Sequence, residues 1–284
     1  MQRILERVSS MYGDLSRPPL RAHELRRALV SPTSRWRDVE VLDEVESTNT
    51  VLAQQAAGGA PSGAVLVAEH QASGRGRLDR GWSAPVRSAI TMSVLVRPHG
   101  MPLSSWPWVP LLAGLAVAAS VRHETTVPAS LKWPNDVVVD DRKLAGVLVE
   151  RVDGGAPGAA AVIGLGVNVS LSADELPTQN ATSLLLEEAT TTDRSVLVRA
   201  ILRALDGLLS TWECSGTEPR NGLLPAYVDA CSTLGRQVRV ELPDGGSSTG
   251  EAVGVDETGR LLVRSTEGQQ AFAAGDVVHL WPKT

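Results

Sequence analysis

The segment from Gly74 to Trp82 places three arginines and three glycines within nine residues. Glycine allows backbone shapes that other residues avoid, and the arginine guanidinium offers forked donors that suit phosphate and carboxylate oxygens. This composition predicts a loop that moves and that binds a small anion. An RNA-binding patch is the alternative, but such patches usually repeat and interleave aromatic residues, whereas this segment occurs once with one tryptophan at its end.

Two lysines mark a second candidate site. Lys132 begins the run Lys-Trp-Pro-Asn-Asp at residues 132–136, and Lys143 lies in the run Arg-Lys-Leu-Ala-Gly at residues 142–146. If the two runs form one hairpin, the lysines come from adjoining strands and can converge on one polyphosphate, with Asp136 near enough to hold a metal or orient an amine. The spacing equally allows two solvated lysines at strand ends.

Gly164 and Gly166 form a third candidate, inside a run of apolar residues from 161 to 169. The run lacks the last glycine of a dinucleotide fingerprint and is expected to be a strand, so a Rossmann site is excluded. Glycine inside a strand marks the close approach of a ligand or of neighbouring protein atoms. We therefore expect either a flat ring lying against this strand or simple close packing.

Composition excludes several other classes of function. The chain has 27 Lys and Arg against 32 Asp and Glu, which gives a formal net charge of −5 and does not indicate a nucleic-acid binder. The five histidines show no metal-ligand spacing, and neither a GxSxG elbow nor a GxxxxGK(S/T) loop is present. The two cysteines, Cys214 and Cys231, predict reduced thiols in a cytoplasmic protein.

The elements that must position these residues follow from hydrophobic periodicity. Strands are expected at 39–42, 64–68, 89–96, 137–139, 144–149 and 161–169, and helices at 20–30, 50–57, 109–121, 198–212 and 223–228. From residue 234 on, short β-rich runs alternate with turns and predict a small β-barrel of about 50 residues. We expect a flexible leader at 1–19 that is not a secretory signal, a large domain at 20–231 and the barrel at 232–284.

Four segments in this order and spacing, 74–82, 132–136, 142–146 and 164–168, resemble those of the bacterial biotin protein ligases. The resemblance covers about residues 39 to 281, and the form without an N-terminal DNA-binding domain fits best because only about 38 residues precede the first expected strand. It implies an α+β catalytic domain, with a mixed β-sheet flanked by helices, followed by a small SH3-like β-barrel.

The resemblance also implies a two-step reaction. Biotin and ATP give biotinyl-5′-AMP and pyrophosphate, and the adenylate then acylates a lysine of a biotin carboxyl carrier domain, as in acetyl-CoA carboxylase. Mg²⁺ is expected with the pyrophosphate leaving group, without assigned protein ligands. The expected partners are biotin, ATP and the carrier domain, with no DNA and no membrane, and the protein is expected to be a monomer or a homodimer.

Single residues receive roles from the same resemblance. Lys143 matches the principal catalytic lysine, and Arg77 and Lys132 join it in the expected catalytic group. We add Asp136 as a hypothesis of our own, because an acidic group beside two lysines can position and deprotonate the incoming lysine amine. The residues expected to bind biotin are Ser47, Thr48, Asn49, Gln71, Gly74, Arg75, Lys143, Gly146, Gly164 and Gly166. The residues expected to bind ATP and the adenylate are Arg77, Arg80, Trp82, Lys132, Asn135 and Asn168.

Two other functions remain open at this point. A lipoate or octanoate ligase shares the fold and the adenylate chemistry, although the complete Gly-Arg-Gly-Arg loop favours biotin. A non-catalytic sensor of biotin or nucleotide is the other, although the presence of both Lys132 and Lys143 favours an enzyme. A nucleic-acid-binding role of the barrel is disfavoured because its arginines are mixed with acidic residues.

Overall fold

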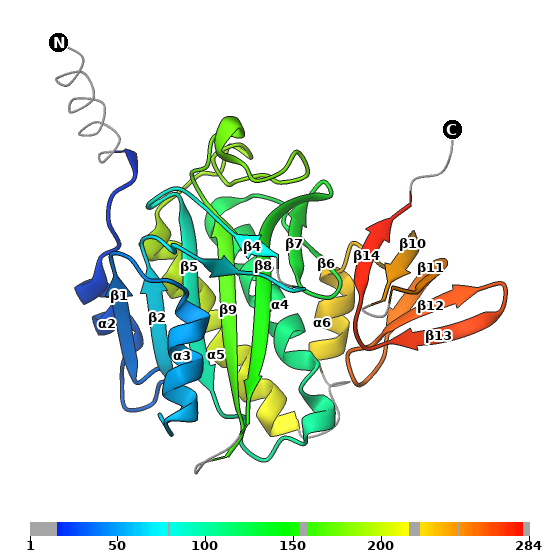
Figure 1. The fold of residues 1–284 in the computed structure, drawn as a ribbon, viewed down its shortest axis with the longest axis horizontal. Helices are drawn as coiled ribbons and strands as arrows, with labels where there is room; N and C mark the ends of the chain where they lie inside the picture. The colour runs from blue at the N-terminus through cyan, green and yellow to red at the C-terminus, as the bar shows by residue number, and fades with distance from the viewer. Residues whose placement is uncertain (1–15, 79, 154–157, 216–221, 243–244, 281–284) are drawn as a thin grey trace.

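The computed structural model describes residues 16–280 apart from 79, 154–157, 216–221 and 243–244. Its centre is a seven-stranded sheet in the order β1-β2-β5-β9-β8-β7-β6 (Figure 1). The strands are β1 (Asp38–Leu42), β2 (Ala64–Ala68), β5 (Ala89–Val96), β6 (Ser130–Lys132), β7 (Asp136–Val139), β8 (Arg142–Val152) and β9 (Ala160–Asn168). β1 and β2 pair in parallel and the other neighbours pair antiparallel, so the predicted mixed sheet is confirmed.

Helices cover both faces of this sheet (Figure 1). One face carries α3 (Thr48–Ala57), and the other carries α4 (Trp108–Thr125) and α5 (Arg194–Ser215). The shorter helical elements are α2 (Ala22–Leu29), α6 (Leu223–Ala230), η1 (Leu103–Ser105) and η2 (Ala173–Glu175). α4 is buried along most of its length because it lies between the sheet and α5. Within the described ranges, no helix has the length and apolarity that a membrane crossing requires.

A second, five-stranded antiparallel sheet lies beside the first, in the order β13-β12-β11-β10-β14 (Figure 1). It consists of β10 (Gln237–Glu241), β11 (Ser247–Val255), β12 (Leu261–Ser265), β13 (Gly268–Phe272) and β14 (Asp276–His279). Two buried tryptophans join it to the larger sheet: Trp108 Nε1 donates to the carbonyl of Glu257 at 2.6 Å, and Trp133 Nε1 donates to that of Gly259 at 3.1 Å. The predicted small β-domain is therefore present and packed against the rest.

The hairpin that carries Lys143 differs in one respect from the prediction. β7 and β8 turn at Asp140 and Asp141, whose φ angles of 46° and 63° suit a two-residue hairpin turn. Lys132, however, ends β6, and β7 lies between β6 and β8. The prediction that Lys132 and Lys143 come from adjoining strands is wrong, because the chain reverses once more between Lys132 and Asp136, which pair directly across β6 and β7.

The predicted leader at 1–19 lies mainly outside the described residues, but its last residues are held against the large domain. Arg17 NH1 donates to Glu175 Oε1 at 3.0 Å, and the Pro18 carbonyl accepts from Arg194 NH2 at 2.7 Å. Arg194 also pairs with Glu69 at 2.6 Å, and both side chains are almost fully buried. This ion pair ties the start of the described chain to the start of α5.

We expect Arg194→Ala to lower the free energy of unfolding by about 3–5 kcal/mol, because it leaves the Glu69 carboxylate buried without its counter-charge. Urea unfolding followed by tryptophan fluorescence measures this loss. The matched control is Glu24→Ala, which removes the exposed pair between Arg21 and Glu24 and should cost less than about 1 kcal/mol. Equal effects of the two substitutions would contradict a structural role of the buried pair.

Candidate active site

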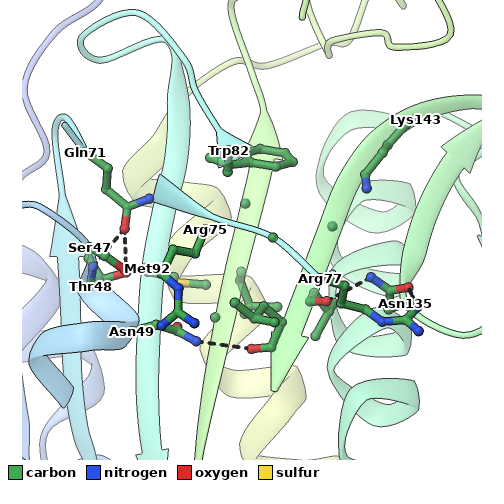
Figure 2. Close-up of a pocket in the computed structure, with 17 residues that line it drawn as sticks. Ser47, Thr48, Asn49, Gln71, Arg75, Arg77, Trp82, Met92, Asn135 and Lys143 are labelled. Atoms are coloured by element: carbon green, nitrogen blue, oxygen red, sulfur yellow. Dashed lines mark hydrogen bonds between the residues drawn. The ribbon is translucent and has the colours of Figure 1, made fainter. Parts of the chain in front are cut away.

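A pocket opens on the sheet face that carries α3, beneath a small hairpin made of β3 (Gly74–Arg75) and β4 (Gly81–Trp82). Figure 2 shows its side chains, which come from the start of α3, from the hairpin and from strands β8 and β9. Twelve of the predicted site residues line it, namely Ser47, Thr48, Asn49, Gln71, Arg75, Arg77, Trp82, Asn135, Lys143, Gly146, Gly164 and Gly166. Tertiary structure thus brings together segments that lie up to about 120 residues apart in the chain.

One wall of the pocket is a chain of hydrogen bonds. Ser47 caps α3, since its Oγ accepts from the N–H of Thr50, and this places Thr48 and Asn49 at the pocket. Thr48 Oγ1 lies 2.9 Å from Gln71 Oε1 and 2.7 Å from Ser93 Oγ, and Ser93 Oγ donates to Asn49 Oδ1 at 2.5 Å. Thr48, Asn49 and Ser93 are almost fully buried and Gln71 is partly exposed, so the wall offers fixed polar atoms to a ligand.

Sequence reasoning missed Ser93, the fully buried centre of this wall. Ser93 lies in β5, a strand that is otherwise mostly apolar and is buried along its whole length. A hydroxyl in such a strand needs a partner, and that requirement is a signal that the sequence did contain. Five further residues of the lining were also missed: Gly76, Met92, Val147, Leu148 and Leu165.

The two strand glycines make room for protein side chains. A Cβ added at Gly164 would lie 2.3 Å from Asn49 Oδ1, and one added at Gly166 would lie 2.4 Å from the ring of Trp82. Of the two interpretations that the sequence left open, close packing by the protein therefore accounts for both glycines, and the flat ring against β9 is the indole of Trp82. The buried indole nitrogen of Trp82 has no hydrogen-bond partner among the described residues, so it can donate to a ligand.

Lys143 stands at the other end of the pocket, on β8 (Figure 2). Its Nζ lies 2.7 Å from Asp136 Oδ1, and both side chains are partly exposed. Asp136 begins β7 and does not itself line the pocket. The pair places a cation and a carboxylate at one point, as the sequence predicted for an amine-handling or phosphate-handling site.

The arginine loop closes against the second sheet. Arg77 NH1 donates to Asn135 Oδ1 at 2.6 Å, and its NH2 donates to the carbonyl of Gly275 at 3.2 Å. Arg77 and Arg80 both pair with Asp276 at the start of β14. Burial lowers the pKa of the Arg77 guanidinium, and the carboxylates of Asp276 and Asp136 oppose that shift. The loop is therefore held by the barrel domain as well as by the pocket.

Five predicted residues lie outside the pocket lining: Gly74, Arg80, Lys132, Asp136 and Asn168. Arg80 turns to Asp276, and Lys132 lies two strands away from Lys143. Asn168 differs most from its predicted place on the nucleotide side, because its side chain is buried and its Nδ2 donates to the carbonyl of Thr182 at 2.9 Å. Gly74 serves the hairpin, since an added Cβ would lie 2.3 Å from the carbonyl oxygen of Trp82.

Comparison with known proteins places this site in a family. Residues 41–168 match the Biotin/lipoate A/B protein ligase family, and residues 233–280 match the Biotin protein ligase C terminal domain. The biotin-(acetyl-CoA-carboxylase) ligase of Mycobacterium tuberculosis is 40% identical over 271 residues, which cover 94% of this chain and 98% of that protein. This chain belongs to the biotin protein ligase family.

Other relatives agree with this assignment. The bifunctional ligase/repressor BirA of Escherichia coli is 30% identical over 240 residues, which cover 84% of this chain and 73% of BirA. The structure of the Aquifex aeolicus biotin protein ligase in complex with biotin and ATP has a TM-score of 0.71 and 27% sequence identity, and the match covers 86% of this chain and 99% of that one. The predicted family and the predicted α+β architecture with a small C-terminal β-domain are confirmed.

Proposed function

We propose that this protein activates biotin with ATP and transfers it to a lysine of the carrier domain of a biotin-dependent carboxylase. The observation that carries the proposal is one pocket with a buried wall of hydroxyl and amide groups at one end and Lys143 at the other, under a loop of arginines. The names of the M. tuberculosis and A. aeolicus relatives support biotin and ATP as substrates and acetyl-CoA carboxylase as acceptor.

In the first step, a carboxylate oxygen of biotin attacks the α-phosphorus of ATP, and the bond to the pyrophosphate group breaks. Both reactants are anions, so a fixed ammonium between them reduces repulsion and stabilises the charge that grows on the phosphate. We assign this role to Lys143, and we assign the guanidinium group of Arg77 to the phosphates and that of Arg75 to the biotin site. The indole of Trp82 is assigned to the adenine.

The other assignments follow the geometry. Ser47, Thr48, Asn49 and Gln71 form the wall that suits the ureido ring. Glycines 146, 164 and 166 leave room for the side chains of Lys143, Asn49 and Trp82 that shape the pocket, and Gly74 leaves room for the hairpin. Asn135 holds Arg77 in place beside the nucleotide. Arg80, Lys132 and Asn168 contribute to the nucleotide side only if their side chains move from the positions described above. We also propose that the catalytic domain ends at residue 231 and that the C-terminal β-barrel domain begins at residue 232.

We also propose that Mg²⁺ neutralises the charge of the leaving pyrophosphate. Within the described residues, no three His, Cys, Asp or Glu side chains gather at metal-binding distance. Because Mg²⁺ usually binds through substrate phosphates and keeps several waters, the residues present fit an ion carried mainly by the nucleotide. Asp136 supplies a carboxylate beside Lys143.

Pyrophosphate release from ATP and Mg²⁺ tests the proposed activity, with biotin, lipoate and octanoate supplied separately. Of the three acids, we expect only biotin to give pyrophosphate release. An added biotin carboxyl carrier domain should then increase in mass. Release with lipoate or octanoate in place of biotin would make the protein a ligase for those acids. Biotin binding without release of pyrophosphate from any acid would make it a sensor and would overturn the enzymatic proposal.

Asp136 is proposed to act in the second step. The acceptor lysine attacks the carbonyl carbon of the mixed anhydride, the amide forms, AMP leaves, and Asp136 takes the proton that the amine loses. We expect Asp136→Asn to slow transfer from preformed biotinyl-5′-AMP by about 100-fold, because general-base catalysis is worth about 10²–10⁴. A single-turnover assay at saturating carrier domain measures the rate, and wild-type transfer by Asp136→Asn would remove this role.

Arg77 is proposed to hold the loop closed over the adenylate, and we expect Arg77→Gly to release it. Each charged hydrogen bond that is lost costs about 1.5–3 kcal/mol. This corresponds to a tenfold or larger change in the equilibrium between the closed and the open loop. Leakage is measured as biotin attached to an added lysine-rich protein. Self-labelling competes little with this acceptor because this chain has only three lysines, Lys132, Lys143 and Lys283. Arg151→Gly removes an exposed pair with Asp153 outside the site and should not leak. Leakage at the wild-type level from Arg77→Gly would contradict the lid role.

A further inference from the structure

Glu150 lies on β8 behind the pocket wall, and none of the roles assigned above includes it. Its Oε2 accepts from Asn49 Nδ2 at 2.8 Å, and its Oε1 lies 2.9 Å from NH1 of Arg75. The side chain is about three-quarters buried, with an exposed fraction of 24%. One carboxylate therefore joins a fixed residue at the start of α3 to an arginine of the loop hairpin.

The charge on Glu150 decides which way the buried wall is polarised. A carboxylate only accepts hydrogen bonds, so the nitrogen of the Asn49 amide must face Glu150 and its oxygen must face Ser93. The Ser93 hydroxyl has one proton, which it donates to Asn49 Oδ1. It therefore cannot also donate to Thr48 Oγ1. The donors and acceptors that Asn49 and Thr48 present to a ligand thus follow from Glu150, which is one hydrogen bond from Asn49 and three from Thr48.

Arg75 gives Glu150 its second effect. The Arg75 side chain is half exposed and belongs to a two-residue strand, so little else fixes its position. The ion pair with Glu150 holds its guanidinium over the same end of the pocket where the Asn49 amide lies. Since this end of the pocket is the one proposed for the ureido ring, the orientation of Arg75 bears on the binding of the acid substrate rather than on the nucleotide.

We propose that Glu150 is a positioning residue for the acid substrate, which sets the polarity of the Thr48-Ser93-Asn49 wall and anchors Arg75 from a single carboxylate. The inference rests on the proposed function, because it takes biotin to be the acid that this wall binds. It assigns to Glu150 no contact with substrate. Its effect should appear in the KM for biotin more than in the KM for ATP or in kcat.

A reciprocal exchange of groups tests this role. Asn49→Asp alone places two carboxylates side by side, so the bond to Glu150 is lost and the two charges repel. Glu150→Gln alone removes the charge that anchors Arg75 and leaves the Leu148 carbonyl, 3.5 Å from Asn49 Nδ2, as the acceptor that orients the Asn49 amide. In the double variant, the new carboxylate at 49 accepts from Ser93 and from the new amide at 150, whose oxygen still accepts from Arg75. The bonds to Ser93, between positions 49 and 150, and to Arg75 are then restored together with the net charge, and the 3.5 Å bond from Asn49 Nδ2 to the Leu148 carbonyl is lost.

We expect the KM for biotin to rise about 10-fold in Glu150→Gln and about 100-fold in Asn49→Asp, and to return to within about 3-fold of wild type in the double variant. The KM for ATP should change less than about 3-fold in Glu150→Gln. The KM for biotin of Asn49→Asp should decrease as the pH falls, because one of the two adjacent carboxylates then takes a proton. The double variant should lack this pH dependence. Asp153→Asn, an exposed carboxylate just past the same strand, is the matched control and should leave every parameter unchanged.

Calorimetric titration of biotin into the full chain separates this inference from the proposed function. Wild-type protein that neither binds nor activates biotin overturns the proposed function. Wild-type protein that binds biotin, with Glu150→Gln at the wild-type affinity, overturns the role of Glu150 alone. If Asn49→Asp fails to fold, recovery of folding and of biotin binding in the double variant supports the inference. A double variant no better than the product of its two single variants overturns it.

Discussion

Lys143→Ala is expected to slow biotin-dependent pyrophosphate release by about 10²–10³-fold, the range found when one preorganised donor to developing charge is removed. The Lys143 side chain lines the pocket, and its ammonium lies 2.7 Å from Asp136. Its loss removes the cation from the point where two anions must meet, and it also leaves the Asp136 carboxylate there to repel them. Initial rates at saturating biotin and ATP measure the effect.

Two further variants sharpen this prediction. Adding Asp136→Asn to Lys143→Ala should recover about tenfold of the adenylation rate, because it removes the unbalanced carboxylate. Lys132→Ala should cost less than Lys143→Ala, since β7 separates the two lysines. Arg142→Ala is the control, because Arg142 is exposed and pairs with Glu187 away from the pocket. A rate for Lys143→Ala near that of this control would remove Lys143 from the catalytic group.

Gly164→Ala is expected to weaken biotin binding by about 100-fold, which corresponds to about 2.7 kcal/mol. The new Cβ would lie 2.3 Å from Oδ1 and 2.9 Å from Cγ of Asn49. Asn49 cannot give way easily, because it is 4% exposed and is held by Ser93 on one side and by Glu150 on the other. The substitution therefore displaces the wall that is proposed to meet the ureido ring, while the rest of β9 keeps its pairing.

Gly207→Ala is the matched control for this steric effect. Gly207 lies on an exposed face of α5, and an added Cβ meets no heavy atom within 4 Å. Because alanine is favoured over glycine inside a helix by about 0.5–1 kcal/mol, this variant should be slightly more stable and bind biotin normally. Calorimetric titration and thermal unfolding of both variants provide the test. Folded Gly164→Ala with wild-type affinity would show that Asn49 does not shape the biotin site.

The sequence by itself determined the architecture and most of the site. Patterns of apolar residues predicted the buried α4, the long α5 and six of the seven strands of the central sheet, because burial imposes its period on neighbouring residues. The three-residue strand β6 (Ser130–Lys132) is too short to show such a period. Boundaries were less exact: the expected helix at 198–212 extends over Arg194–Ser215, since Asp193 caps it by accepting from the N–H groups of Ser195 and Val196. Twelve of the predicted site residues also meet in one pocket.

Only the tertiary structure decided which polar groups meet. Asn49 bonds to Glu150 across 101 residues and Arg80 pairs with Asp276 across 196, and no local pattern contains either contact. The order of strands set Lys132 apart from Lys143, and the fold of the hairpin laid Trp82 on Gly166. Periodicity and turn residues depend on which side of a segment faces solvent and on neighbouring residues in the chain. The partners of a buried polar group depend instead on how distant segments pack, which the sequence encodes only through the whole fold.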